Sequence, residues 1–475
     1  MGESVVNTPE WVKHAVFYQI FPERFANGDP TNDPENVMPW GSAPTPANYM
    51  GGDLQGIINH LDYLADLGVT ALYLNPIFQA NSNHKYNTYD YYRIDPSFGT
   101  MATFHALIEQ AHARHMRVIL DGVFNHCGRG FYAFIDILEH EVHSPYREWF
   151  SIKEFPLSPY DDTKPANYAC WWDIRSLPKF ATNHGPVRQY LLDVARYWIE
   201  QGADGWRLDV PNEIDDHDFW REFRQVVKTA NPDAYIVGEI WEDADPWLDG
   251  SQFDGVMNYV FQRLCRAFFA YRKIPVDKFA VGIETLIRRY PPEITQAQLN
   301  LLGSHDTARF LTEAEGKRER LYAPILLQMT FPGAPCIYYG DEIGLQGGED
   351  PHCRGCFPWD EQQTWDQDFR GWIQQCIRIR QSHPTLRTGS FRTLLVRTDL
   401  SIWAFARQDE QHCLIVVLNP NEQAQTIDIP LTDLPVYQVN QAVDLLGTGR
   451  YMIRHRQIYQ VELAAWRGAV LALSN

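Results

Sequence analysis

The most constraining feature of this sequence is an alternation of short apolar segments with amphipathic ones, which recurs eight times between residues 15 and 381. The short segments are rich in β-branched and aromatic residues, as in buried strands, and the longer ones show the apolar spacing of helices. The expected strands occupy residues 15–21, 69–74, 118–124, 205–210, 235–240, 255–259, 299–303 and 336–339. The clearest helices are expected at residues 54–67, 104–114, 187–201, 218–230 and 369–381. Eight strand–helix units predict an α/β fold, a parallel (β/α)8 TIM barrel.

Two regions interrupt this alternation. Residues 127–182 are rich in Pro, Trp, Tyr and Asp, show no clear helix and are too long for an ordinary loop, which predicts an inserted subdomain after strand three. From residue 384 the pattern changes to apolar–polar alternation with turn residues, as in SIWAFARQ, which predicts antiparallel strands. The predicted domains are a barrel at 1–126 and 183–383, the inserted subdomain at 127–182 and a C-terminal antiparallel β-sandwich at 384–475.

Composition excludes several classes of partner. The 475 residues carry 60 acidic and 41 basic side chains, a net charge of -19, and no basic run dense enough to follow a phosphate backbone, so no nucleic-acid partner is expected. No segment approaches the ~18 apolar residues of a membrane-spanning helix, and the first ten residues do not resemble a signal peptide. We therefore expect a cytoplasmic protein with no membrane partner. Cys353 and Cys356 form a single CxxC, which we interpret as loop thiols.

Polar residues stand where the expected strands end. In a parallel barrel the loops that follow the strands meet at one mouth, so these side chains are expected to lie close together. Arg207 and Asp209 are two residues apart on one strand, and their side chains should therefore point to the same side. The strand-end residues are, in chain order, Asp121, Asn125, His126, Arg207, Asp209, Glu239, His305 and Asp306.

Carboxylates from different strands, with an arginine and two histidines, suit glycoside hydrolysis, in which one carboxylate is the nucleophile and another donates a proton. Asp209 is the expected nucleophile because Arg207 would keep it ionised. Glu239 is the expected proton donor because its sequence neighbours are apolar. Asp306 would bind sugar hydroxyls, and Trp241 would stack on a glucose ring. Any one of these residues is more simply explained by a salt bridge or a capped strand end, but their joint placement at one face favours a catalytic site.

The segments DGVFNH, GWRLDVPNE, VGEIW and LLGSHD resemble, in order and spacing, the signature segments of the α-amylase family of glycoside hydrolases (family 13). The resemblance is closest to the neopullulanase, cyclomaltodextrinase and maltogenic amylase subgroup. It implies Asp209 as nucleophile, Glu239 as acid/base and Asp306 as transition-state stabiliser, with no organic cofactor. It also implies that the first glucose subsite is lined by Tyr86, His126, Arg207 and His305.

The same resemblance implies the substrate and the oligomeric state. The expected activity is retaining hydrolysis of α-1,4-glucosidic bonds in starch, maltooligosaccharides, pullulan or cyclodextrins, through a covalent glycosyl-enzyme and with some transglycosylation. Because the first strand is expected near residue 15, we expect the subgroup's N-terminal dimerisation domain to be lacking and the protein to be a monomer. The alternatives are a catalytically silent carbohydrate-binding protein on the same fold, or a transglycosylase or isomerase of the family.

Two further predictions concern single residues and a metal. Glu213 follows the predicted nucleophile by four residues and is expected to order a water or an incoming sugar hydroxyl, although capping of the next helix explains it equally well. The segments NGDPTND and GGD offer oxygen ligands for a hard cation, whereas an Asx or proline turn accounts for them without a metal. The family resemblance favours structural Ca²⁺. The candidate ligands are Asn27, Asp29, Asn32, Asp33, Gly51 and Asp53.

Overall fold

The computed structural model describes residues 7–161, 163–432, 434 and 439–474. The chain divides into two compact units. The first comprises Met1–Pro9, Tyr18–Met257 and Arg354–Trp359, and the second comprises Glu10–Phe17, Asn258–Cys353 and Asp360–Asn475. These units do not test the three domains predicted from the sequence, whose boundaries stay predictions.

The predicted (β/α)8 barrel is confirmed. Its strands follow one another in the order β8-β7-β6-β5-β2-β1-β10-β9. They are β1 (Phe17–Ile20), β2 (Ala71–Leu74), β5 (Arg117–Gly122), β6 (Gly205–Leu208), β7 (Tyr235–Gly238), β8 (Gly255–Val256), β9 (Leu299–Leu301) and β10 (Ala334–Tyr338). Strand β5 pairs in parallel with β2 and β6, and β7 pairs with β6 and β8. Every residue of β2, β6 and β7 is buried, as expected for parallel strands covered on both faces.

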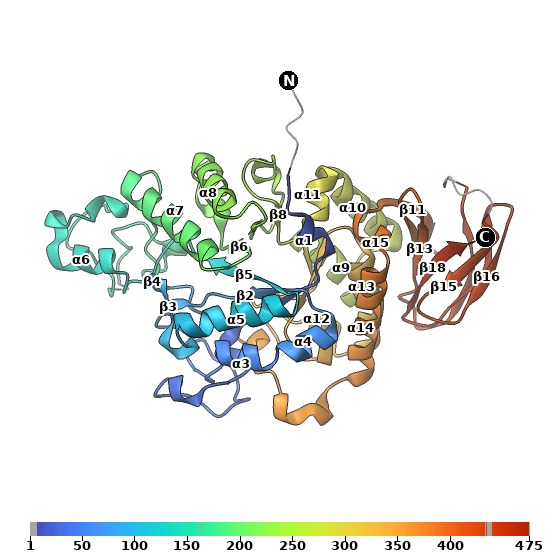
Figure 1. Cartoon of the computed structure of the whole chain (residues 1–475), viewed down its shortest axis with the longest axis horizontal. Helices are drawn as coiled ribbons and strands as arrows, with labels where there is room; N and C mark the ends of the chain where they lie inside the picture. The colour runs from blue at the N-terminus through green and yellow to red at the C-terminus, as the bar shows by residue number, and fades with distance from the viewer. Residues whose placement is uncertain (1–6, 162, 433, 435–438, 475) are drawn as a thin grey trace, which may run out of the picture. The chain divides into compact units, whose positions relative to one another are not determined.

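Helices flank the strands of the first unit (Figure 1). They are α3 (Leu54–Asn59), α4 (Leu61–Leu67), α5 (Met101–Ala113), α7 (Gly185–Glu200) and α8 (His217–Ala230), and α3 packs on α5 while α7 packs on α8. The single helix expected at residues 54–67 is wrong, because the chain leaves the helical conformation at His60. The ring nitrogen Nδ1 of His60 lies 2.8 Å from the carbonyl of Gly56, and the backbone N–H of His60 donates to the carbonyl of Ile57 instead. The same ring stacks on Trp359, with centroids 3.6 Å apart.

The region at residues 127–182 contains a helix that the sequence reasoning missed. This helix, α6 (Tyr132–His140), buries Ala133, Phe134 and Ile137, whose spacing was a signal for one apolar face. Antiparallel bridges connect the region internally and to His126, the residue just before it. They join His126 to Lys179, Phe150 to Phe180, Ile152 to Tyr168 and Cys170 to Pro178.

The longer helices of the second unit include α9 (Tyr259–Cys265), α10 (Val276–Arg289), α13 (Tyr322–Thr330) and α14 (Gln367–Ser382). The strand predicted at residues 255–259 ends at Val256, so the prediction that Tyr259 lies on a strand is wrong. The side chain of Asn258 accepts a hydrogen bond from the N–H of Phe261 and caps α9, which begins at Tyr259. In the described part of the chain, no helix is both long and apolar enough to span a bilayer.

The remaining strands of the second unit confirm the predicted antiparallel C-terminal structure, with the order β11-β12-β13-β18-β15-β16-β17-β14. They are β11 (Ser390–Arg397), β12 (Ile402–Gln408), β13 (Cys413–Leu418), β14 (Gln425–Pro430), β15 (Gln441–Asp444), β16 (Arg450–Arg454), β17 (Gln457–Leu463) and β18 (Gly468–Ser474). Their inward-facing residues form one apolar core, which includes Ile402, Ile415, Ile429 and Leu471.

Candidate active site

Arg207 on β6 is the centre of the candidate site in the first unit, and its side chain is fully buried. Its Nη1 lies 2.7 Å from Oδ1 of Asp121 and 3.2 Å from Oδ1 of Asp209, and its Nη2 lies 3.0 Å from Oε2 of Glu239. Burial opposes the charge of the guanidinium, but Asp121 and Glu239 outweigh this and raise the pKa of Arg207 well above its ordinary value. One permanently charged arginine therefore contacts three carboxylates, a set that we call the Arg207 cluster.

The register of the sheet produces this arrangement. Asp121 and Arg207 are partners across β5 and β6. Past the strand ends, the N–H of Asp209 donates to the last carbonyl of β5, and the N–H of Glu239 donates to the last carbonyl of β6. The backbones of the predicted nucleophile and proton donor are thus fixed by hydrogen bonds at the carboxyl ends of the strands, where barrel enzymes carry their chemistry.

Asp121 has a role that the sequence reasoning did not assign. Its Oδ2 accepts hydrogen bonds from the hydroxyls of Tyr73 (2.9 Å) and Tyr86 (2.8 Å). The amide of Asn75 in turn donates to the hydroxyl of Tyr86 at 2.9 Å. Asp121 therefore positions both Arg207 and Tyr86. The signal in the sequence was its place at the start of DGVFNH.

Glu239 is held from two sides. Its Oε1 accepts a hydrogen bond from the indole N–H of Trp241 at 3.0 Å, and its Oε2 accepts one from the backbone N–H of Val210 at 3.1 Å. Val210 has φ 36° and ψ 50°, a left-handed conformation that is strained for a β-branched residue. This strained turn, directly after Asp209, aims a backbone donor at the predicted acid/base.

His126 is a neutral donor in this structure. Its Nδ1 lies 3.2 Å from the side-chain amide nitrogen of Asn125, which donates to it and leaves the proton on Nε2. Burial lowers the pKa of His126 to about 3, so the ring is uncharged near neutral pH. Within the described residues, its buried Nε2 makes no well-aligned hydrogen bond, although the backbone of Tyr86 lies close enough to the ring to oppose part of the effect of burial on its pKa. This group is suited to donate to a ligand hydroxyl.

The predicted residues His305 and Asp306 lie in the second unit, shortly after β9. Nε2 of His305 is 3.1 Å from Oδ2 of Asp306, and the side chain of Asp306 is 27% exposed while that of His305 is buried. The N–H of Asp306 donates to the hydroxyl of Ser304 at 3.3 Å. Cys353, of the CxxC segment, is buried and donates to the carbonyl of His305 at 3.1 Å.

Glu213 meets a residue that was not predicted to belong to a site. Nζ of Lys179 donates to the backbone carbonyl of Glu213 at 2.6 Å and lies 3.7 Å from its Oε2. The side chain of Glu213 is one-third exposed, and both residues line a hollow of about 430 Å³. The Glu213 carboxylate is therefore accessible to a molecule in that hollow.

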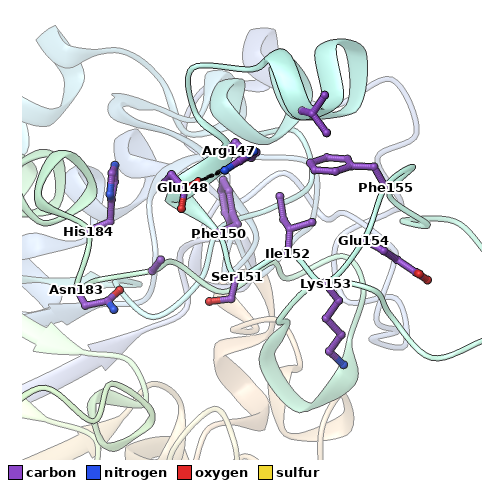
Figure 2. Close-up of a pocket in the computed structure, with 12 residues that line it drawn as sticks. Arg147, Glu148, Phe150, Ser151, Ile152, Lys153, Glu154, Phe155, Asn183 and His184 are labelled. Carbon is purple, nitrogen blue, oxygen red and sulfur yellow. Dashed lines mark hydrogen bonds and ion pairs between the residues drawn. The ribbon is translucent and has the colours of Figure 1, made fainter.

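A second hollow, of about 580 Å³, lies among residues of the inserted region (Figure 2). Arg147 and Glu148, which form a 2.6 Å ion pair, lie on its lining together with Phe150 and His184. None of the predicted site residues lines this hollow. Its volume alone would therefore have pointed away from the Arg207 cluster.

The six candidate metal ligands gather in one place, which we call the loop cluster. The amide nitrogen of Asn27 donates to Oδ1 of Asp33 at 2.8 Å. Gly51 has φ +84°, and a Cβ added there would lie 2.3 Å from that Asp33 oxygen. The carbonyl oxygens of the Asn27 and Asn32 side chains are buried and have no donor among the described residues. Buried, unmatched amide oxygens in a loop that also carries carboxylates are compatible with a hard cation.

Asp53 differs from the other members of the loop cluster. Its carboxylate accepts hydrogen bonds from the N–H groups of Gly28, Asp29 and Gly56, the last as the N-cap of α3. Asp53 therefore fixes the backbone of the loop through these hydrogen bonds. No group of three or more His, Cys, Asp or Glu side chains that could hold a metal ion occurs among the residues the structure describes, so a metal here would need amide and backbone oxygens in addition to carboxylates.

The chain matches two known domains. Residues 19–383 match the catalytic domain of alpha amylase, and residues 391–470 match the C-terminal domain of maltogenic amylase. A cyclomaltodextrinase from a Bacillus species is 49% identical over 425 residues, which are 89% of this chain and 75% of that protein. Neopullulanase 2 from Thermoactinomyces vulgaris is 47% identical over 89% of this chain and 72% of its own length.

A solved structure extends the similarity. The cyclic alpha-maltosyl-(1→6)-maltose hydrolase from Arthrobacter globiformis, in complex with its cyclic sugar, has a TM-score of 0.89 and 42% identity over 98% of this chain and 100% of its own. The match to the catalytic domain and the relatives named as hydrolases show that the chain is a glycoside hydrolase. The chain belongs to the α-amylase family. Within that family it is similar to the cyclomaltodextrinases, neopullulanases and maltogenic amylases.

Proposed function

We propose that this enzyme hydrolyses α-1,4-glucosidic bonds of starch and maltooligosaccharides with retention of anomeric configuration. The observation that carries the proposal is the contact of Arg207 with both Asp209 and Glu239. A retaining hydrolase needs two carboxyl groups close together, and one shared guanidinium holds this pair as neighbours. The names of the relatives support an α-glucan as the substrate, with pullulan and cyclodextrins as further members of the class.

In the proposed mechanism, the carboxylate of Asp209 attacks the anomeric carbon while Glu239 protonates the departing glycosidic oxygen. This forms a covalent glycosyl-enzyme. Glu239, now deprotonated, removes a proton from a water molecule, whose oxygen displaces Asp209 from the anomeric carbon. A sugar hydroxyl in place of water gives transglycosylation. Asp306 keeps the role of transition-state stabiliser that the family resemblance implies.

The proposed first glucose subsite uses neutral and charged donors. His126 offers its Nε2–H to a sugar hydroxyl, and the hydroxyl of Tyr86 is oriented by Asp121. His305 is proposed as a second imidazole donor. Trp241, which is 38% exposed, offers an indole face beside Glu239.

We also propose that the loop cluster binds a structural Ca²⁺. The side-chain carbonyls of Asn27 and Asn32, the carboxylates of Asp33 and Asp29 and the carbonyl of Gly51 would supply its oxygen ligands. The unmatched buried oxygens of Asn27 and Asn32 support this set. When bound, the ion would stabilise the fold without taking part in the chemistry.

The anomer released in the first minutes tests the mechanism. Proton NMR of maltoheptaose hydrolysis should show the α-anomer before mutarotation, because two displacements at the anomeric carbon restore its configuration. Product analysis on starch, pullulan, β-cyclodextrin and maltotriose gives the substrate range in the same experiment. Initial release of the β-anomer would contradict retention, and absence of turnover on all four sugars would contradict the proposed activity.

A further inference from the structure

The inserted region carries a tryptophan pair that the proposed mechanism does not use. The rings of Trp171 and Trp172 are nearly parallel, at 14°, with centroids 4.6 Å apart. Trp171 in turn stacks on the ring of His126 at 5.4 Å and 19°. The three flat rings form a row. It begins at His126, which is predicted to bind a glucose hydroxyl, and ends at Trp172, which is 73% exposed.

The backbone keeps Trp172 at the surface in an unusual conformation. Trp172 has φ 49° and ψ 35°, and the next residue, Asp173, has φ 59°. Left-handed values are disfavoured for residues with a Cβ and persist where the surrounding structure enforces them, often at binding sites. Hydrogen bonds from the N–H of Trp171 to the carbonyl of Leu177 and from the N–H of Ile174 to the carbonyl of Trp171 close this loop.

The loop is also fixed relative to His126. Antiparallel bridges join Cys170 to Pro178 and His126 to Lys179, and the N–H of Cys127 donates to the carbonyl of Pro178. The strand pairing that holds His126 therefore also holds the segment leading into Trp171. A platform ordered in advance loses little conformational entropy when a ligand binds.

We infer that Trp171 and Trp172 form a stacking platform for a further glucose ring of a longer α-glucan chain. A pyranose ring has an apolar face of C–H groups and a rim of hydroxyls, which suits an exposed indole. This inference rests on the proposed function, because it assumes that another ring of the same chain lies at His126. The platform makes the enzyme select substrates by chain length.

The test compares one long and one short substrate. The quantity measured is the ratio of kcat/KM for maltoheptaose to kcat/KM for an aryl α-maltoside. In Trp172→Ala this ratio should fall about tenfold through KM for the long substrate, because one stacked ring is lost. Trp172→Phe keeps a flat ring and should retain most of the ratio, whereas Trp172→Leu keeps apolar volume without a flat face and should lose it.

A matched control lies in the same region. Tyr160 is also 73% exposed, and its ring lies under the guanidinium of Arg129 at 4.5 Å. Tyr160→Ala should therefore leave the ratio unchanged. Equal ratios in wild type, Trp172→Leu and Trp172→Phe would overturn the inference. A wild-type enzyme that cleaves neither substrate would instead overturn the proposed function, so the two failures are distinguishable.

Discussion

The Arg207 cluster and the loop cluster differ in how their buried side-chain oxygens are satisfied. In the Arg207 cluster, the guanidinium contacts all three carboxylates. Asp121 also accepts hydrogen bonds from the hydroxyls of Tyr73 and Tyr86. Glu239 also accepts them from the indole of Trp241 and the N–H of Val210. In the loop cluster, two buried amide oxygens have no donor among the described residues.

This difference indicates what each region needs. The Arg207 cluster is organised by its own charges, so the protein alone can keep it ready for a substrate. The loop cluster has a surplus of acceptors, and burying unmatched acceptors costs free energy unless a cation satisfies them. The Arg207 cluster should therefore lose its function or stability when one of its carboxylates is changed. The loop cluster should lose stability when a metal is removed.

Asp209→Asn should produce the largest effect. An amide cannot form the glycosyl-enzyme, so kcat for maltoheptaose should fall by at least roughly 10⁴-fold. Calorimetry should show that the variant still binds the sugar. Asp215→Asn makes the same chemical change on an exposed carboxylate six residues later and should keep the rate within about twofold. A variant of Asp209 that retains more than about a hundredth of the rate would remove this residue from the proposed role.

Asp121→Asn should break the internal charge balance of the Arg207 cluster. Removing one partner of a buried ion pair leaves charge uncompensated, so the free energy of unfolding should fall by about 3 kcal/mol or more. Urea denaturation measures this. The control is Asp218→Asn, which removes a 2.7 Å pair with Arg221 that is largely exposed and should cost under about 1 kcal/mol. Equal losses of unfolding free energy in the two variants would show that the buried ion pair of Asp121 with Arg207 stabilises the fold no more than an exposed pair does.

Removal of calcium should affect only the loop cluster. Saturation at about 100 times Kd adds roughly 2.7 kcal/mol of stability, so EDTA should lower the melting temperature by a few degrees and added calcium should restore it. Activity well below the melting temperature should survive. Asp33→Ala should abolish the calcium-dependent shift.

The control for the calcium experiment is Asp161→Ala. Asp161 accepts hydrogen bonds from the N–H and hydroxyl of Thr163, as Asp29 does from Thr31, but it lies outside the loop cluster. The Asp161→Ala variant should keep the calcium-dependent shift in melting temperature. A melting temperature indifferent to both chelator and added calcium favours a turn without a metal.

Strand-end residues were predictable because a parallel ladder fixes them in space. The positions of Arg207, Asp209 and Glu239 follow from where three apolar runs stop, and the register brings their side chains together. The anchoring role of Asp121 was not predictable in the same way. It depends on Tyr73 from the neighbouring strand and on Tyr86 from a loop, and no local pattern reports such partners.

The errors in the fold arose at one position where other contacts compete with the local pattern and at one where the pattern was weak. The periodicity at residues 54–67 is that of one helix, yet the chain leaves the helix at His60. The His60 side chain contacts the carbonyl of Gly56 and stacks on Trp359, about 300 residues later in the chain. The missed helix α6 had an apolar face, but its short length and the surrounding proline and aromatic residues hid it. Local propensity decides an element only when tertiary contacts do not compete with it.

Glu213→Gln should give the smallest effect and extends the comparison to the segment that follows β6 and Asp209. Lys179 holds the backbone carbonyl of Glu213, and glutamine keeps that carbonyl and nearly the same side-chain shape. The substitution therefore removes only the carboxylate charge. If that charge orders the acceptor, the ratio of transfer to hydrolysis at high maltose concentration should change about threefold with little change in total rate. Chromatography of the products measures the ratio.

The matched control is Glu222→Gln, on the neighbouring helix α8, where the carboxylate contacts only Arg188 among the ion pairs that the structure describes. It should leave the ratio unchanged. If Glu213→Gln behaves like this control, the contact with Lys179 is structural, and the residue only ties the inserted region to the segment after β6. If the ratio shifts in Glu213→Gln alone, a carboxylate outside the Arg207 cluster chooses between water and sugar as the acceptor. Bond cleavage and the choice of acceptor would then depend on two different sets of residues. The charges buried around Arg207 are fixed, whereas a partly exposed carboxylate can contact different acceptors.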